Sequence, residues 1–393
     1  MDARRRFRIL QVGALSLWKD RGDSLHAREL AFALHEAGVE PILLNLPGPK
    51  APSDSELREV RAPVFAIRFL RQLSWNVTGT IAGIAAVRRF NPDVVYSRME
   101  PGIFVGLWVS LISGRPLIVE INGLPTADVR LYRPNNTALI GLTRIWERTM
   151  YGRADRVLGA VGYIRFVQDH FGVPANKCIE APLGVNTSVF TPLERRECLA
   201  KQGREDVPTV VWAGVISAWQ GLVVLVDAVE IVAGGCPAVQ FVVVGGGITE
   251  GWLRDEIERR GLAGKVSLVG PKPYGEVNEF LGCATVCVAT FPGNRGDRGT
   301  ISSLKTLTYL ASGRPVVTNE MDEMGRQIQD AGAGLMVPPD DGPSLAAAIL
   351  TILGEDHAAW RGRCAASRRM AESQTWRHKA EIIAGCLGDI SGS

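Results

Sequence analysis

The sequence predicts an α/β fold of two tandem domains, each a doubly wound parallel sheet with helices on both faces. Three observations support this prediction. Apolar runs of strand length alternate with amphipathic stretches of helix length, which is typical of βα units. The runs are almost continuously apolar, as expected for strands that are buried on both faces. The pattern stops once, in the charged stretch 193–207, and then starts again.

The first domain begins with a strand over 8–12 and a polar loop, followed by a helix over 24–36 and a strand over 40–46. In an open parallel sheet, the loop after the first strand lies at the carboxyl edge, where ligands bind. The dinucleotide fingerprint G-x-G-x-x-G is missing from this loop, so we do not infer NAD. Further strands are expected at 94–96, 116–121 and 156–161, and further helices at 81–90, 102–112, 139–151 and 164–171.

The second domain repeats the alternation of strands and helices. Its strands are expected at 209–213, 239–244, 266–269, 285–289, 316–319 and 334–337, and its helices include 222–232, 344–353 and a long helical stretch over 358–387. Two similar α/β halves in tandem imply a cleft that can bring two substrates together away from water.

A further helix is predicted to begin near Ser303, because Ser302 and Ser303 can cap it and apolar residues recur at helical spacing as far as Ala311. Lys305 then lies in the first turn. A helix N-terminus carries unpaired N–H groups and partial positive charge, so a lysine and two hydroxyls there suit a diphosphate. The alternative is an ordinary packed helix with a solvated lysine.

The composition argues against several classes of protein. A chain of 393 residues with 46% hydrophobic and 22% charged residues is globular and can bury two cores. A net charge of +3 does not argue for a nucleic-acid partner. Seven scattered cysteines and no histidine pair at ligand spacing predict reduced thiols, no metal and no cofactor. The most apolar segment, 102–112, is too short to span a bilayer. We expect no secretory leader and a cytoplasmic location, with peripheral contact to the inner face of the membrane left open.

Four segments carry a resemblance to a known family. They are LGVNTSVFTP over 183–192, the stretch 302–317, the stretch 332–339, and Gly214 with the WQG loop that follows it. Together they resemble family-4 glycosyltransferases, whose GT-B fold has two Rossmann-like domains facing a cleft. Two further segments, 94–100 and 120–125, are similar to N-domain segments of bacterial exopolysaccharide or natural-product members.

The resemblance implies a retaining hexosyltransferase that moves a sugar from a nucleoside-diphosphate sugar to a lipid-linked or small-molecule acceptor. It implies an acceptor domain over 1–192, a linker over 193–207, a donor domain over 208–357 and helices over 358–393 that return to the first domain. In this family the leaving phosphate helps to deprotonate the acceptor, so no protein nucleophile is required.

Five positions depart from the family pattern. Thr300 and Thr308 stand where the family has glutamates, Gln220 and Val215 stand where it has a lysine and an arginine, and Asn122 replaces a histidine. A threonine binds ribose hydroxyls less strongly than a carboxylate, and two missing cations weaken the grip on a diphosphate. A second hypothesis is therefore an accessory subunit that has lost transfer and assists an active partner transferase. An epimerase or phosphorylase on the same fold is a third.

The expected site residues come from loops at the carboxyl edges of the two sheets. The expected donor-binding residues are Gly214, Trp219, Gln220, Gly270, Arg298, Thr300, Ser302, Ser303, Lys305 and Thr308. The expected acceptor-binding residues are Gly13, Gly22, Asp23 and His26. Asn122 and Lys305 are the expected catalytic residues, although Asn122 can also be read as a turn residue. A surface or packing role is the alternative for His26, and a place in a solvated loop is an equal alternative for Arg298.

Overall fold

The computed structural model describes residues 6–19, 22–52, 55–65, 68–293, 303–320 and 323–391. Chain contacts divide it into two compact units: Met1–Gly184 with Trp376–Ser393, and Val185–Thr375. We call these unit 1 and unit 2. Each described sheet is parallel throughout, with seven strands in unit 1 and six in unit 2. The predicted fold class of two doubly wound α/β domains is therefore confirmed.

Unit 1 is a sheet in the order β3-β2-β1-β4-β5-β6-β7. The register places Leu10 opposite Ile42 on one side and Val95 on the other. Its strands are β1 (Arg8–Val12), β2 (Glu40–Asn45), β3 (Arg58–Arg61), β4 (Val94–Arg98), β5 (Leu117–Glu120), β6 (Arg156–Gly159) and β7 (Cys178–Glu180). Its helices are α1 (Gly22–Glu36), α2 (Arg68–Phe90), α3 (Val105–Ser113), α4 (Pro125–Tyr132), α5 (Thr137–Arg153), α6 (Val161–Phe171), the short η1 (Ala175–Lys177) and α15 (Trp376–Ser391).

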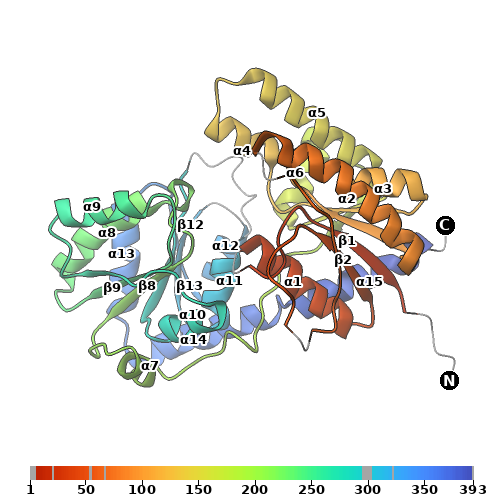
Figure 1. Cartoon of the computed structure of the whole chain (residues 1–393). Coiled ribbons are helices and arrows are strands. Elements are labelled where there is room, and N and C mark those ends of the chain that lie inside the picture. The colour runs from red at the N-terminus through yellow and green to blue at the C-terminus, as the bar shows by residue number, and fades with distance from the viewer. Residues whose placement is uncertain are drawn as a thin grey trace, which may run out of the picture. The chain divides into compact units, whose positions relative to one another are not determined.

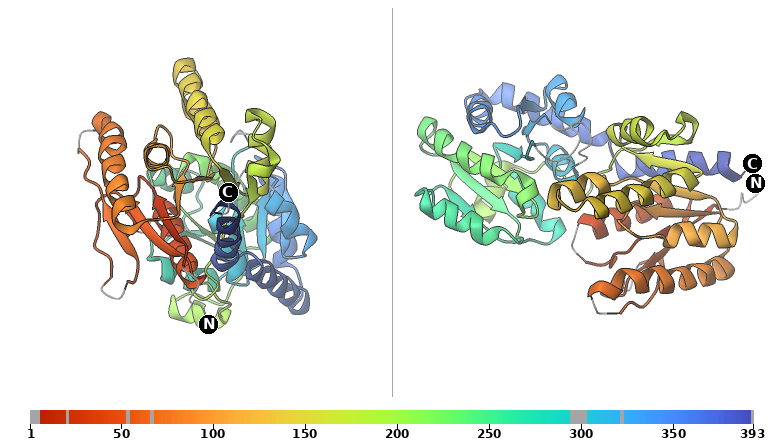
Figure 2. Two further views of the ribbon diagram at one scale, coloured as in Figure 1. Left: turned by 90° about the vertical axis from the view of Figure 1, so that its right-hand side faces the viewer. Right: turned by 90° about the horizontal axis from the view of Figure 1, so that it is seen from above.

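Both faces of this sheet are covered, because neighbouring strand residues enter different cores. Leu43 packs with Ala27 and Ala31 of α1, whereas Ile42 and Leu44 belong to the core beneath α2, α3, α5 and α6. Helix α15 packs on α1, and α2 lies beside α3 (Figure 1, Figure 2). This two-sided burial explains why the strands read as continuous apolar runs.

Unit 2 is a sheet in the order β10-β9-β8-β11-β12-β13. Its strands are β8 (Thr209–Ala213), β9 (Gln240–Val244), β10 (Val266–Leu268), β11 (Val286–Ala289), β12 (Val316–Asn319) and β13 (Gly334–Val337). Its helices are α7 (Arg195–Lys201), η2 (Ala218–Gln220), α8 (Leu222–Gly235), α9 (Glu250–Arg259), η3 (Tyr274–Glu276), α10 (Val277–Gly282), α11 (Leu304–Ala311), α12 (Glu323–Asp330), α13 (Gly342–Leu353) and α14 (His357–Glu372). Helices α8, α9 and α13 pack against one face, and α11 packs against α14.

Several elements differ from the sequence-based expectation. Helix α2 begins at Arg68 rather than at 81, because its first half keeps large apolar side chains exposed and so lacks the usual core-facing pattern. Strand β3, REVR, has no apolar run because it is a partly exposed edge strand. The charged stretch 193–207 contains helix α7. Helix α15 is part of unit 1, whereas α14 is part of unit 2.

The described helices and polar side chains allow two further statements. Over the described ranges, none of the helices combines the length and apolar character that a bilayer-spanning segment requires. In that same part of the chain, no three histidine, cysteine or acidic side chains gather as metal ligands.

A buried acid in unit 1 makes stability depend on pH. Glu147 of α5 is fully buried and accepts a hydrogen bond from the Thr126 hydroxyl of α4. Burial raises the pKa of Glu147 from 4.5 to about 7. The folded state therefore holds this proton more tightly than the unfolded state does. The resulting stabilisation is complete below the unfolded pKa and is lost as the pH rises through the folded pKa.

We expect the free energy of unfolding of the wild type to fall by about 2 to 3 kcal/mol between about pH 5 and about pH 8, relative to Glu147→Gln. Urea denaturation of both proteins at several pH values measures this difference. Parallel pH profiles for the two proteins would contradict the assignment.

Candidate functional site

A candidate site in unit 2 surrounds the first turn of α11. Ser303 caps the helix, and its side chain accepts a hydrogen bond from the Thr306 N–H over 3.4 Å. The Tyr309 hydroxyl, one turn further on, donates to the Ala213 carbonyl over 2.8 Å and accepts from the Ala213 N–H over 2.7 Å. The carboxyl end of β8 is thereby fixed to α11, which carries Lys305.

The Lys305 ammonium lies where β8 and β11 end. It donates to the Gln220 side-chain oxygen and to the Thr290 carbonyl, the latter over 3.1 Å. It also lies 4.2 Å from the ring centroid of Phe291 and 5.1 Å from that of Trp212. Aromatic faces attract a cation most strongly where water is partly excluded. The arrangement therefore holds a positive charge at a fixed point beside the N-terminus of a helix.

Closely packed backbone forms the neighbouring loops. The Gly214 N–H donates to the Val244 carbonyl, and the Gly245 N–H donates to the Gly270 carbonyl, both over 2.9 Å. Gly245 has φ +139°, and a Cβ there would lie 1.8 Å from the Gly214 carbonyl oxygen. Gly221 has φ +64° and touches the Phe291 backbone. Side chains are thus excluded at Gly245 and Gly221, where only main-chain atoms can face a ligand.

The predicted donor residues fall into three groups. The structure brings Gln220 and Lys305 into direct contact, and Thr308 donates its hydroxyl to the Lys305 carbonyl over 2.7 Å. Gly214, Gly270, Trp219 and Ser303 follow the ends of neighbouring strands or begin α11. Three predicted residues, Arg298, Thr300 and Ser302, lie outside the described residues.

A cavity in unit 1 opens at the carboxyl edge of β1 and β4. Its volume is about 430 Å³, and its lining includes Asp23, Trp75, Arg98 and Glu100. The Glu100 carboxylate accepts the Ala14 N–H over 2.9 Å, and burial raises the pKa of this carboxyl group. The cavity therefore presents an acid beside an arginine.

Arg98 is almost completely buried in the same wall. One terminal nitrogen donates to the Asp23 carbonyl, while its Nε has no partner among the described residues. Sequence reasoning missed Arg98 and Glu100 as site residues. The sequence did contain a signal, because two charged residues lie at and just after the end of a strand that begins with apolar residues. Open α/β sheets bind ligands at the carboxyl ends of their strands.

The predicted acceptor residue His26 is placed away from this cavity. Its ring is buried, donates from Nε2 to the Glu120 carboxylate over 2.9 Å, and meets the Trp376 ring edge-on at 4.8 Å. Glu120 also pairs with Lys379 of α15 over 2.7 Å. Burial lowers the pKa of His26 to about 4 despite the neighbouring carboxylate, so the ring is neutral at physiological pH. The structure places His26 in the packing of α1 against α15, and its acceptor role stays a prediction.

The remaining predicted residues of unit 1 occupy different environments. Asp23 lines the cavity, Gly13 is buried and donates to the Leu44 carbonyl over 3.1 Å, and Gly22 is exposed at the start of α1. Asn122 follows β5, and both polar atoms of its amide are buried without a partner among the described residues. An unpaired buried amide costs free energy, so it is a feature to be explained by a ligand or by water.

Comparisons with known proteins agree with this architecture. The protein-family model described as Glycosyltransferase Family 4 matches residues 21–189. The family model described as Glycosyl transferases group 1 matches residues 207–355. The phosphatidyl-myo-inositol mannosyltransferase of Mycolicibacterium smegmatis is 28% identical over 382 residues, which are 95% of this chain and 91% of that protein. The α-D-kanosaminyltransferase of Streptomyces kanamyceticus is 25% identical over 199 residues, 51% of this chain and 48% of that protein.

Solved structures share the whole fold. Sucrose-phosphate synthase from Thermosynechococcus elongatus superposes with a TM-score of 0.81 at 18% identity, over 98% of this chain and all of that one. Anabaena Alr3699/HepE, crystallised with UDP-glucose, gives a TM-score of 0.75 at 15% identity over 98% and 100% of the two chains. The fold is that of GT-B enzymes, and the two family models together leave only 190–206 unmatched between residues 21 and 355. The chain therefore belongs to the family-4 glycosyltransferases.

Proposed function

We propose that this glycosyltransferase transfers a hexose from a nucleoside-diphosphate sugar to a lipid-linked acceptor, with retention of anomeric configuration. The observation that carries the proposal is the position of Lys305 at the N-terminus of α11, held by Gln220 and the Thr290 carbonyl. In this proposal the sequence range 208–357 holds the donor and the range 1–192 holds the acceptor.

A diphosphate leaving group fits the Lys305 environment chemically. Negative charge grows on the leaving phosphate during transfer, and a fixed cation with oriented N–H groups stabilises that charge without reorganising. Gln220 stands where the resemblance leads us to expect a lysine, yet its side-chain oxygen accepts from Lys305. We infer that Gln220 orients the remaining lysine. Although Gln220 replaces a lysine of the family pattern, Lys305 is still held in place as a cation in the described part of this edge.

The cavity of unit 1 suits a polar acceptor that carries phosphate. Arg98 offers an unpaired Nε beside the cavity, and a guanidinium binds phosphate oxygens well. Glu100, whose pKa is raised by burial, accepts a hydrogen bond from a sugar hydroxyl in our proposal. Phosphate and hydroxyl groups occur together in lipid-linked sugar acceptors.

A lipid acceptor is further supported by an exposed apolar stripe on the same wall of unit 1. The stripe consists of Leu70, Leu73, Val77 and Ile81 of α2 with Trp108, Leu111 and Ile112 of α3. Leu73 and Ile81 are 61% and 65% exposed. The first turns of α2 also line the cavity with Arg71 and Trp75, and Arg88 and Arg89 end that helix. Apolar and basic side chains together suit the surface of an anionic bilayer.

The stripe is tested by sedimentation with vesicles of phosphatidylcholine containing about 30% phosphatidylglycerol. We expect Leu73→Glu combined with Ile81→Glu to weaken vesicle binding by more than about tenfold, because two apolar side chains no longer enter the bilayer. Ile248→Glu is the matched control, since Ile248 is an exposed apolar residue of unit 2 at 94% exposure. Equal losses in the two proteins would contradict a specific membrane face.

Asn122 gives a second test that separates function from stability. Replacing it with alanine removes two buried polar atoms that have no partner among the described residues, so we expect the Tm to stay unchanged or to rise. Turnover should nevertheless fall about tenfold, because a hydrogen bond to the substrate is lost. Thermal unfolding and nucleoside-diphosphate release are measured on the same preparation. A lower Tm with unchanged turnover would mean that Asn122 is only a structural turn residue.

The transfer itself is tested with purified protein, UDP- or GDP-hexoses and vesicles that contain bacterial lipid-linked sugars. The proposal expects nucleoside diphosphate to be released only when acceptor is present, and proton NMR of the product gives its anomeric configuration. Release without acceptor, or a product of inverted configuration, would overturn the corresponding part of the proposal.

A further inference from the structure

A second cavity lies in unit 2 at the edge opposite the Lys305 site. Its volume is about 1030 Å³, ample for a small metabolite. Its walls include Thr285 and Pro208, which directly precede β11 and β8, and Arg314, which lies two residues before β12. All three strands are parallel, so this cavity lies at their amino ends whereas Lys305 lies at their carboxyl ends. The two sites are therefore separated by the length of the strands.

The wall of this cavity contains a buried cation without a carboxylate partner. Arg314 is only 3% exposed. One terminal nitrogen donates to the Leu193 carbonyl, and the guanidinium lies 5.7 Å from the ring centroid of Trp360. Its Nε has no hydrogen-bond partner, and Arg314 forms no ion pair with any acid in the described ranges. Burial lowers the pKa of this guanidinium, which reflects the same lack of compensation.

A charge in this position is costly unless something offsets it. Removing a cation from water costs several kcal/mol of desolvation free energy, and contacts with a carbonyl and an aromatic face offset only part of that cost. Proteins usually supply a carboxylate. In this wall the Glu355 carboxylate is already occupied by Arg363 at 2.7 Å, and Asp206 is shared between Arg195 and Arg196. Two of the three acids in the lining are therefore committed to other arginines, and the third, Glu194, is an exposed residue of the same lining.

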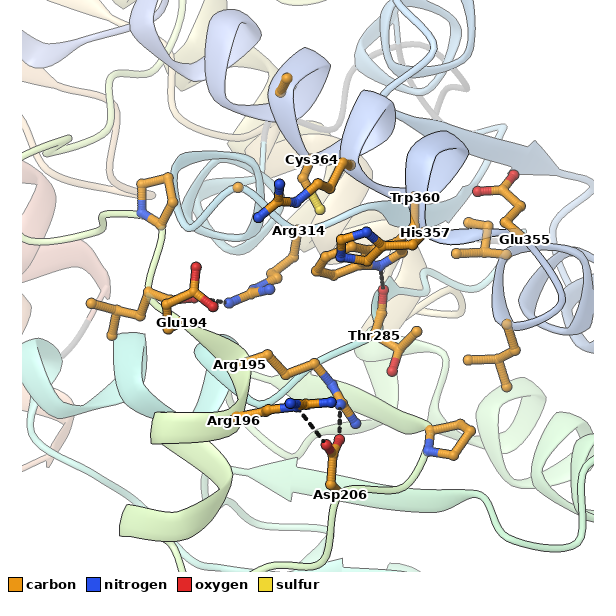
Figure 3. A pocket seen from close by; sticks show the side chains of 18 of the residues that line it. Glu194, Arg195, Arg196, Asp206, Thr285, Arg314, Glu355, His357, Trp360 and Cys364 are labelled. Atoms are coloured by element: carbon orange, nitrogen blue, oxygen red, sulfur yellow. Dashed lines mark hydrogen bonds and ion pairs between the residues drawn. The ribbon is translucent and has the colours of Figure 1, made fainter.

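Further basic groups face the same space. Figure 3 shows Arg314 with the rings of Trp360 and His357 on one side of the cavity, and Arg195, Arg196 and Asp206 on the other. Arg361 of α14 also lines the cavity. It has no ion pair among the described residues and is exposed. An anion bound here would meet a buried guanidinium and an exposed one from two different elements.

We propose that this cavity is a second ligand site that binds a phosphate monoester of a small metabolite, with Arg314 and Arg361 as its phosphate-binding residues. Guanidinium groups pair with phosphate oxygens through strong, charge-assisted hydrogen bonds. The site is independent of the donor site, because it uses the amino ends of the strands. A ligand there would also stabilise the contact between α14 and the segment that precedes α7.

Isothermal titration with glucose 6-phosphate and with inorganic phosphate tests the proposal at constant ionic strength, so that general screening is equal throughout. We expect binding with a Kd of about 1 mM or tighter, and we expect it to persist in Lys305→Ala. Arg361→Ala should weaken it about tenfold, the value of one hydrogen bond to a charged group. Arg369→Ala is the matched control, since Arg369 is an exposed arginine of the same helix outside the cavity.

Arg314→Gln provides an independent readout. The ligand should raise the Tm of the wild type and should not raise the Tm of this variant, whatever the variant's own stability is. A Tm increase in Arg314→Gln equal to that of the wild type would overturn the proposal. So would absence of binding up to about 10 mM ligand, equal effects of Arg361→Ala and Arg369→Ala, or loss of binding in Lys305→Ala, which would assign the phosphate to the donor site.

Discussion

Lys305→Ala is expected to lower kcat/KM for the sugar donor by at least about tenfold, because the variant loses the cation that we propose faces the leaving phosphate. The loss should exceed that for an exposed lysine, since Lys305 is held between the Phe291 ring and the Thr290 carbonyl. Steady-state release of nucleoside diphosphate measures the effect, and titration with the nucleotide separates a loss of affinity from a loss of turnover.

Lys201→Ala is the matched control for this prediction. Lys201 is also in unit 2, but it is 65% exposed and pairs with Glu279 at the surface. Its removal should leave kcat/KM within about twofold of the wild type. Full activity of Lys305→Ala would contradict the proposed placement of the donor phosphates.

Lys379→Met is expected to reduce the free energy of unfolding by about 3 to 5 kcal/mol, because it removes the cation that pairs with the buried Glu120 carboxylate. The side chains of Glu120 and Lys379 are 0% and 2% exposed, and their charged atoms are 2.7 Å apart. In the wild type His26 does not share this role at neutral pH, since burial lowers its pKa to about 4. Urea denaturation at about pH 8 measures the loss.

The same helix offers a control for this effect. Arg377 is 77% exposed and pairs with Glu381 one turn away, so Arg377→Met should cost no more than about 0.5 kcal/mol. Similar losses in Arg377→Met and Lys379→Met would mean that the buried pair does not attach α15 to β5 and α1. A selective loss in Lys379→Met would identify the pair as the main polar attachment of this terminal helix.

Much of the fold follows from local patterns in the sequence. The central strands of both sheets are recognisable because burial on two faces demands continuous apolar runs, as in β9 with QFVVV. The start of α11 is recognisable because Ser303 provides the expected cap. Edge elements were missed for the opposite reason: β3 is partly exposed, so its residues, REVR, carry no apolar signal.

The candidate sites were less predictable, because they depend on contacts between distant segments. Lys305 and Gln220 meet although 85 residues separate them, and only the resemblance to a family linked them beforehand. His26 was assigned to the acceptor because it lies near a loop. Its hydrogen-bond partner Glu120 is 94 residues away, on strand β5. Arg314 offered no signal at all, since burial without a carboxylate partner is a property of the folded chain.

The central claim is that unit 2 still binds a nucleoside-diphosphate sugar despite its substituted positions. Calorimetric titration of the purified protein with UDP, GDP and their common sugar conjugates tests this claim most directly. We expect one nucleotide to bind with a Kd in the range of about 1 to 100 μM, with affinity reduced in Lys305→Ala and unchanged in Arg361→Ala. Absence of binding to every nucleotide would contradict the account, and would favour a chain that keeps the fold and assists an active partner transferase.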